Sequence, residues 1–273
     1  MEYKTFPGGI KIPVIGIGTW EMGENISEDV KNIKALKEAI RLGMTHIDTA
    51  ESYAAGHAEE LVGKAIKSFN RKRLFITTKV KPEHLRFDQV LKAAKASLKR
   101  LDTDYIDLYL IHWPNPDIFL EETMRAFDFL VDEDLVKYIG VSNFSVKLLE
   151  EAQSYSKNKI IANQVEYNLL SREPEKELLS FCQKKKIMLT AYQPLARGKL
   201  AKPGFVLLDE LAKKYGKTQA QIALNWLISK SNVVIIPKSS NIEHLRENLG
   251  AIGWKMEKKD IERLDTYGFK RKN

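Results

Sequence analysis

The chain has 273 residues, of which 44% are hydrophobic and 29% are charged, a balance that supplies a sizeable core and excludes a largely disordered protein. Its formal net charge of +8 arises from basic residues dispersed among acidic ones, which argues against a nucleic-acid-binding surface. One cysteine excludes an intramolecular disulfide, and neither a membrane-spanning stretch nor a signal-peptide core is present, so we expect a cytoplasmic protein with no nucleic acid and no membrane partner.

The chain begins with a predicted β-hairpin. Residues 3–6 and 11–14 are short strand-like segments on either side of Pro7, Gly8 and Gly9, and this Pro-Gly-Gly sequence favours a turn. We expect the hairpin to precede the main sheet and to close one end of it.

Eight short apolar segments recur along the rest of the chain, separated by segments with helical periodicity. They cover residues 15–18, 45–48, 74–79, 105–112, 138–143, 160–166, 187–193 and 233–239. Nearly continuous apolar strands must be covered on both faces, as in a parallel sheet that helices surround. Eight such units favour a closed (β/α)8 TIM barrel over an open doubly wound sheet, which usually has fewer strands. We therefore expect residues 1–273 to form one α/β domain.

Several residues predict where helices begin and end. Ser27, Asp88 and Ser145 each precede or open a helical pattern and are predicted N-caps, whereas Gly43 is placed to end the first helix.

Two helices are expected outside the eightfold repeat. The long interval before the last strand contains two helical patterns, 206–214 and 219–228, of which one is surplus to the repeat. A further helix is predicted at 257–264, and residues 269–273 are expected to be frayed.

Polar or aromatic residues stand at the C-terminal end of every predicted strand. In chain order they are Trp20, Asp48, Lys79, His112, Ser142 with Asn143, Gln164, Tyr192, and Lys238 with Ser239. In a barrel the active site is built from these strand ends and the loops that follow them. Taken alone, each residue is better explained by a hydrogen bond to its own loop. Burying the whole set is costly unless its members pair with one another or with a ligand, so the set predicts a shared pocket.

Three stretches resemble the catalytic motifs of the aldo-keto reductase family. They are THIDTAESY with Asp48 and Tyr53, FITTKV with Lys79, and DLYLIHWP with His112. The resemblance covers the whole chain and includes GIGTW at 16–20, GVSNF at 140–144, NQVEYN at 163–168, AYQPLARG at 191–198 and IPKS at 236–239. It implies a prokaryotic-type family member, a monomer, that reversibly reduces small aldehydes and ketones with hydride from a nicotinamide cofactor.

The four motif residues also suit this reaction chemically. Tyr53 would donate a proton to the carbonyl oxygen, but a tyrosine with its ordinary pKa of about 10 is a weak acid at neutral pH. We expect the Lys79 ammonium to lower that pKa, Asp48 to hold the ammonium in a buried ion pair, and neutral His112 to hydrogen-bond the substrate oxygen. No side chain donates hydride, so a nicotinamide is required.

Other interpretations of these residues remain open. Asp48 and Lys79 could be a structural ion pair, and His112 a satisfied strand-end imidazole. A Schiff-base aldolase would use Lys79 as its nucleophile, although Asp48 would raise rather than lower the lysine pKa. A cofactor-binding regulatory or structural subunit of the same fold is the third alternative, against which the intact set of four residues argues.

The resemblance also implies a cofactor site along the strand ends. Tyr192 would stack on the nicotinamide, and a lysine followed by a helix start near Asn241 would bind an anion. The implied cofactor-binding residues are Gly18, Thr19, Trp20, Asp48, Ser142, Asn143, Gln164, Tyr192, Gln193, Leu195, Ile236, Lys238, Ser239, Ser240, Asn241, His244, Glu247 and Asn248.

His244 departs from the family pattern. Many relatives carry an arginine at this position, which grips the 2′-phosphate of NADPH, whereas an imidazole offers fewer hydrogen bonds and at most a partial charge. The resemblance therefore implies NADPH as the preferred cofactor, with NADH use also open.

The substrate pocket is expected to contain Trp20, Tyr53, His112 and Trp113, an aromatic set that favours apolar or aromatic carbonyl compounds. Trp20 and Trp113 could instead be core residues. The chain stops soon after residues 257–264, so we expect the long C-terminal loop of many relatives to be missing and the substrate range to be broad. No group of residues has metal-ligand spacing, and we expect no metal.

Overall fold

A parallel eight-stranded sheet forms the centre of the computed structural model, which describes residues 1–268. Its strands are β3 (Ile17–Gly18), β4 (His46–Asp48), β5 (Phe75–Val80), β6 (Ile106–Ile111), β7 (Val136–Ser142), β8 (Ile160–Glu166), β9 (Met188–Tyr192) and β10 (Val233–Ile235). Within this sheet each strand pairs with the strand that precedes it and the strand that follows it along the chain, in the order β3 to β10. All eight predicted segments contain a strand, and five of these strands are shorter than predicted, the last one most of all.

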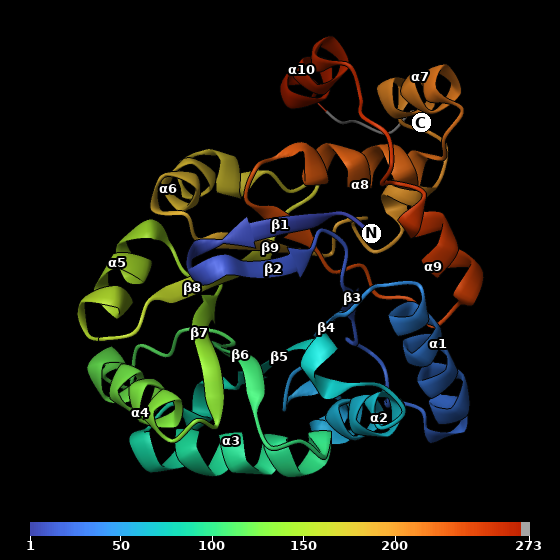
Figure 1. Ribbon diagram of the computed structural model, residues 1–273. Helices are drawn as coiled ribbons and strands as arrows, with labels where there is room; N and C mark the ends of the chain where they lie inside the picture. Colours follow the sequence, from blue (N-terminus) through green and yellow to red (C-terminus); the bar gives the residue numbers. More distant parts are fainter. Residues whose placement is uncertain (269–273) are drawn as a thin grey trace.

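The sheet closes on itself where β3 meets β10. The Gly16 N–H donates to the Ile235 carbonyl at 2.8 Å, and the Ile235 N–H donates to the Val14 carbonyl at 3.0 Å. A parallel bridge also pairs Gly18 with Lys238. These contacts complete the predicted (β/α)8 barrel (Figure 1).

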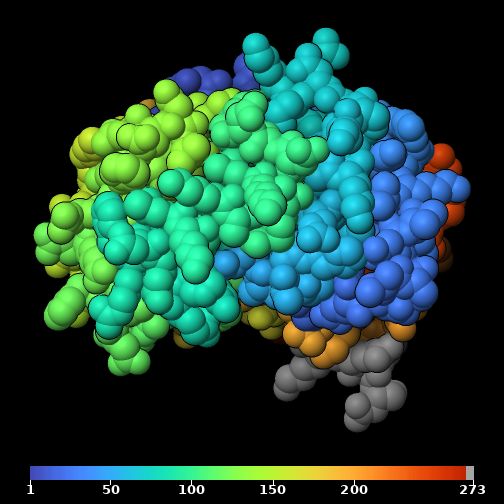
Figure 2. Space-filling model, turned by 90° about the horizontal axis from the view of Figure 1, so that it is seen from below, coloured from blue at the N-terminus to red at the C-terminus, as the bar shows by residue number. Residues whose placement is uncertain are grey.

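Helices surround the barrel. They are α1 (Asp29–Arg41), α2 (His57–Ile66), α3 (Phe87–Leu101), α4 (Leu120–Asp132), α5 (Val146–Ser154), α6 (Leu178–Lys185), α8 (Gln219–Ser229) and α9 (Ile242–Leu249). Figure 2 shows that segments from the first half of the chain, coloured blue to green, cover one side of the molecule. Within residues 1–268, no helix has both the length and the apolar character that crossing a membrane demands.

Two helices lie outside this ring, as expected. They are α7 (Val206–Tyr215) and α10 (Lys258–Thr266), which lie beyond α8 in Figure 1. An ion pair of 2.8 Å between Arg263 and Glu210 joins them. The expected fraying of residues 269–273 lies outside the described part of the chain.

The N-terminal hairpin packs against the inside of the barrel. Strands β1 (Tyr3–Phe6) and β2 (Ile10–Pro13) are antiparallel and are joined by Pro7–Gly9. Their buried side chains form a cluster with inward-facing barrel residues: Phe6, Ile10, Ile12, Leu108, Leu110, Ile161, Ala162, Met188 and Val234. The hairpin therefore plugs one end of the barrel and leaves the other end for a site.

Two predicted helix ends are confirmed. The Ser145 Oγ accepts a hydrogen bond from the Leu148 N–H at 3.3 Å and so caps α5. Gly43 follows α1 with a φ of 93°, a left-handed conformation that glycine adopts without strain.

The other two predicted caps are wrong. Asn25, not Ser27, opens the first helical segment, because the Asn25 Oδ1 accepts from the Ser27 N–H at 3.1 Å. Asp88 lies inside the first turn of α3, and the Phe87 N–H donates instead to the Glu122 carboxylate at 2.9 Å. The sequence around α3 does not reveal this cap, because Glu122 belongs to α4.

Gly63 of α2 packs closely against the C-terminal end of α3. A Cβ atom at this position would lie 2.7 Å from the Arg100 carbonyl oxygen and 3.0 Å from the Leu101 carbonyl. Gly63→Ala should therefore lower the free energy of unfolding by about 1–3 kcal/mol, although alanine is the better helix former. Urea denaturation would measure this. Lys64→Ala, at an exposed position of the same helix, is the control and should have little effect.

Candidate active site

A cavity of about 1120 Å³ opens at the C-terminal end of the barrel strands. Most of the predicted site residues line it: Gly18, Trp20, Asp48, Tyr53, His112, Trp113, Ser142, Asn143, Gln164, Tyr192, Gln193, Leu195, Ile236, Lys238, His244, Glu247 and Asn248. Pockets for drug-sized ligands measure about 300–1,000 Å³, so this cavity has room for a dinucleotide.

Five of the predicted residues do not line the cavity. Thr19 and Lys79 are fully buried behind its wall. Ser239, Ser240 and Asn241 form the turn before α9, which begins as predicted, since the Asn241 Oδ1 accepts from the Glu243 N–H at 2.9 Å.

Several lining residues were not predicted: Glu21, Ser52, Glu166, Pro194, Arg197, Gly198, Ala201, Lys202, Ala220 and Pro237. Half of them lie in the loop after β9. Non-glycine residues Gln193, Ala196 and Arg197 have left-handed φ values of 49°, 49° and 54° there, a shape that no local sequence signal reveals. The Arg197 guanidinium carbon lies 4.9 Å from the centre of the Trp20 ring.

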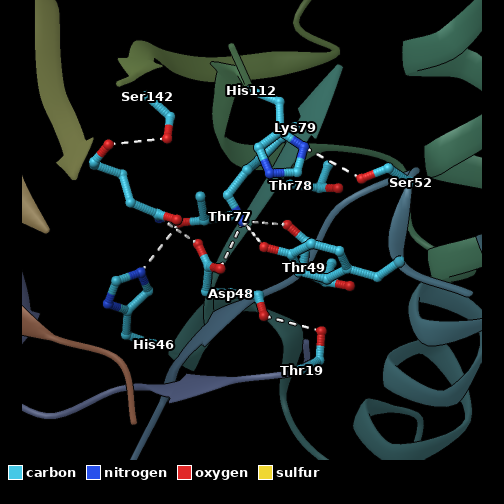
Figure 3. Close-up of polar contacts among 12 residues, drawn as sticks. Thr19, His46, Asp48, Thr49, Ser52, Thr77, Thr78, Lys79, His112 and Ser142 are labelled. Atoms are coloured by element: carbon cyan, nitrogen blue, oxygen red, sulfur yellow. Dashed lines mark hydrogen bonds and ion pairs between the residues drawn. The ribbon is translucent and has the colours of Figure 1, made fainter. Parts of the chain in front are cut away.

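A buried ion pair lies at the base of the cavity (Figure 3). The Lys79 Nζ lies 2.6 Å from the Asp48 Oδ1, and the two side chains are 0% and 2% exposed. The same ammonium donates to the Thr49 carbonyl at 2.8 Å and to the Tyr53 hydroxyl at 3.3 Å. The second Asp48 oxygen accepts from the Gln164 amide at 2.7 Å. Both charges are thereby satisfied, which a buried pair requires.

The protonation of Lys79 follows from these contacts. Burial disfavours the ammonium, but the nearby Asp48 carboxylate and Tyr53 oxygen outweigh burial, so the pKa of Lys79 lies above its ordinary value. A lysine held charged and 0% exposed is a poor nucleophile, which weighs against the aldolase alternative.

The pKa of Tyr53 moves in the direction opposite to the one we expected. Burial raises it above its ordinary value, and the Lys79 charge offsets only part of that rise. Lys79 thus has the expected effect on the phenol, but burial is the stronger influence. The phenol of Tyr53 consequently keeps its proton at neutral pH.

His112 lies beside Tyr53 at the cavity wall. The two rings meet edge to face, with 5.6 Å between their centres. Burial and the Lys79 charge together lower the pKa of His112 to about 3. Its imidazole is therefore neutral at neutral pH, as expected. The Ser52 Oγ lies 3.2 Å from its Nδ1 (Figure 3).

A chain of hydrogen bonds links the ends of β6, β7, β8 and β9. The Tyr192 hydroxyl donates to the Asn143 Oδ1 at 3.1 Å, and the Asn143 amide donates to the His112 carbonyl at 3.1 Å. The Ser142 Oγ donates to the Gln164 carbonyl at 2.9 Å. This wall therefore offers the cavity an aromatic ring together with fixed amide and hydroxyl groups, a set that suits a nicotinamide carboxamide.

Another part of the cavity wall combines a lysine with the start of a helix. Lys238 lines it and lies 3.7 Å from the Glu21 carboxylate, and His244 projects from the first turn of α9. A lysine beside a helix N-terminus is a suitable place for a phosphate. The residues of both walls thus fit a nicotinamide dinucleotide.

Neither Trp20 nor Trp113 is a core residue. Trp20 is half-buried, Trp113 is 49% exposed, and both line the same cavity as Tyr53. The wall next to the phenol is consequently aromatic and open to solvent.

A closed parallel barrel with a tyrosine beside a buried lysine–aspartate pair at its strand ends has the architecture of a (β/α)8 barrel enzyme. Comparison with known proteins identifies the family. The model of the Aldo/keto reductase family matches residues 14–268. A methylglyoxal reductase of Escherichia coli (strain K12) is 37% identical over 264 residues, covering 95% of this chain and 92% of that protein.

Solved structures agree with this assignment. A thermostable aldo-keto reductase in complex with the inhibitor epalrestat is 51% identical, with a TM-score of 0.94, and covers 98% of this chain and 100% of that one. An aldo/keto reductase from Klebsiella pneumoniae in complex with NADP and acetate is 38% identical, with a TM-score of 0.88, and covers 96% of this chain and 94% of that one. The chain belongs to the aldo/keto reductase family and is an NAD(P)H-dependent oxidoreductase.

The buried ion pair makes a prediction about stability. Asp48→Asn should lower the free energy of unfolding by about 3–5 kcal/mol, because it leaves the Lys79 ammonium buried without a counterion. The double variant Asp48→Asn with Lys79→Met should recover part of that loss. Chemical denaturation of the three proteins would measure both effects. Asp132→Asn, which breaks the exposed pair with Lys157, serves as the control. Equal losses for Asp48→Asn and Asp132→Asn would contradict the argument.

Proposed function

We propose that this protein reduces small aldehydes and ketones to alcohols, with NADPH as its preferred cofactor and Tyr53 as the proton donor. The observation that carries the proposal is the Tyr53 hydroxyl, which lies 3.3 Å from the buried Lys79 ammonium at the wall of a large cavity. The names of two relatives support it, since one is a methylglyoxal reductase and the other binds NADP.

The bound nicotinamide would supply a hydride to the carbonyl carbon of the substrate. As the C=O double bond becomes single, its electron pair moves to oxygen, which takes the phenolic proton of Tyr53. Burial raises the pKa of Tyr53, so the phenol is protonated at neutral pH and has a proton to donate, while the Lys79 charge offsets part of that rise. Lys79 then stabilises the phenolate that remains, and Asp48 holds Lys79 at the right distance.

His112 would be the second group on the substrate oxygen. Its neutral imidazole lies beside Tyr53, so an N–H of His112 and the O–H of Tyr53 would form a pair of donors around the oxygen. Trp20 and Trp113 would form the apolar walls for the rest of the substrate. The exposure of Trp113 favours a broad range of small carbonyl compounds.

The cofactor would lie across the strand ends from β7 to β10. The Tyr192 ring would stack on the nicotinamide, and Asn143 and Gln164 would bind its carboxamide. Lys238 would bind a phosphate group near the start of α9. His244 is the reason to keep NADH as the second candidate, because an imidazole offers a 2′-phosphate fewer hydrogen bonds than the bidentate guanidinium of an arginine does.

Replacing Tyr53 by phenylalanine tests the proposed reaction. Tyr53→Phe should lower kcat for carbonyl reduction by at least about 100-fold, because the proton donor is lost, and should leave the Kd for NADPH nearly unchanged. The assay is loss of reduced-nicotinamide absorbance with methylglyoxal and a panel of small aldehydes. Tyr155→Phe, at a tyrosine that is 39% exposed, is the matched control. Full activity of Tyr53→Phe would overturn the mechanism. A wild-type protein that binds NADPH but turns over no carbonyl compound would favour a regulatory subunit.

Replacing His244 by arginine tests the cofactor assignment. His244→Arg should raise the ratio of kcat/KM with NADPH to kcat/KM with NADH by about tenfold, because a guanidinium forms charge-assisted hydrogen bonds to the 2′-phosphate. His244→Lys should give a smaller rise, since lysine lacks the bidentate geometry. Equal improvement with both cofactors would show that residue 244 does not contact the 2′-phosphate.

A further inference from the structure

We propose that Ser52 is a positioning residue that holds His112 in the tautomer with its proton on Nε2. In that form His112 is a hydrogen-bond donor to the substrate oxygen. The inference rests on the proposed function and adds a residue to it.

The contact is specific to one nitrogen of the imidazole. The Ser52 Oγ lies 3.2 Å from the His112 Nδ1, and within residues 1–268 it is the only hydrogen-bond partner of that atom (Figure 3). The Nε2 has no partner in the same part of the chain, and the His112 side chain lines the cavity. One nitrogen is thus occupied by the protein, and the other is left for a ligand.

Ser52 is exposed, but its neighbours hold it in place. On one side, the Glu51 carboxylate accepts from the Lys81 N–H at 2.8 Å, which ties this loop to the loop after β5. On the other side, the Tyr53 hydroxyl accepts from Lys79 at 3.3 Å. The residues on both sides of Ser52 are therefore held by hydrogen bonds. Ser52 consequently loses little conformational entropy when it contacts His112.

The direction of the Ser52 hydrogen bond decides what His112 can do. A neutral imidazole carries one proton, and a hydroxyl group can either donate or accept. If Ser52 donates to Nδ1, the proton is on Nε2 and points to the ligand. If Ser52 accepts, Nε2 presents a lone pair to a carbonyl oxygen, which has only lone pairs of its own and is repelled. Reduction of a carbonyl therefore requires the first arrangement.

Two hydrogen bonds hold the backbone of His112 in place. The His112 carbonyl accepts from the Asn143 amide at 3.1 Å, and the His112 N–H donates to the Val80 carbonyl at 3.0 Å. The main chain of His112 is thus fixed on both sides, and Ser52 is the hydrogen-bond partner of its ring within residues 1–268.

Steady-state kinetics of the full-length enzyme with NADPH and the aldehyde panel give the first test. Ser52→Ala should lower kcat by about fivefold, the loss expected for one hydrogen bond, with little change in the KM for NADPH. Ser52→Thr keeps the hydroxyl and should restore most of the rate. Ser154→Ala removes an exposed serine of α5 and should have no effect. If Ser52→Ala turns over like the wild type, the inference fails.

A second readout separates a positioning role from a structural one. In ¹⁵N-histidine-labelled protein, with the signal assigned by a His112→Asn variant, the wild type should carry its proton on Nε2. Ser52→Ala should show a mixture of the two tautomers, and Ser52→Thr should resemble the wild type. A proton on Nδ1 in the wild type, or an unchanged tautomer in Ser52→Ala, would refute the inference.

The two proposals fail in different ways. If Tyr53→Phe is inactive while Ser52→Ala is unchanged in rate and tautomer, the inference about Ser52 fails and the proposed function stands. If the wild type turns over no carbonyl compound with either cofactor, the proposed function fails, and the inference about Ser52, which rests on it, fails as well.

Discussion

A charged pair inside the barrel wall is the constraint on which the rest of the site depends. An unpaired lysine there would be very costly, so Lys79 needs the Asp48 carboxylate, and the carboxylate in turn needs the Gln164 amide for its second oxygen. The ammonium also donates a hydrogen bond to the Tyr53 hydroxyl. The ion pair that makes the burial of Lys79 possible therefore also positions the Tyr53 phenol and places a positive charge beside it.

Barrel geometry brings these groups together although they are far apart in the sequence. Parallel strands end at the same rim, so polar residues at or near the C-terminal ends of β4, β5, β6 and β8 meet although no local sequence signal links them. The hairpin plugs the opposite end with apolar side chains such as Phe6 and Ile12. One end of the cylinder is thus a core, and the other is free to hold a ligand.

Much of this architecture could be predicted from the sequence, because strand ends and apolar runs are local patterns. The cap of α3 could not, since Glu122 reaches it from another helix. In the loop after β9, Gln193 and Leu195 were predicted, whereas the cavity residue Arg197 was not, because its left-handed conformation has no local sequence signal. The pKa of Tyr53 is raised rather than lowered because the phenol is deeply buried, and the depth of burial is determined only by the packed structure. Ser52 could not be singled out either, because only the tertiary structure brings it to His112.

The junction between β3 and β10 has a consequence for how the protein is made. The hydrogen bonds that join Gly16 to Ile235, and Ile235 to Val14, connect the two extremes of the chain. Such a contact closes a very long loop and is entropically expensive until most other strands are in place. During synthesis, the sheet would remain open, with an unpaired edge strand on each side, until β10 has left the ribosome. Assembly of the ligand cavity would thus be among the last events of folding.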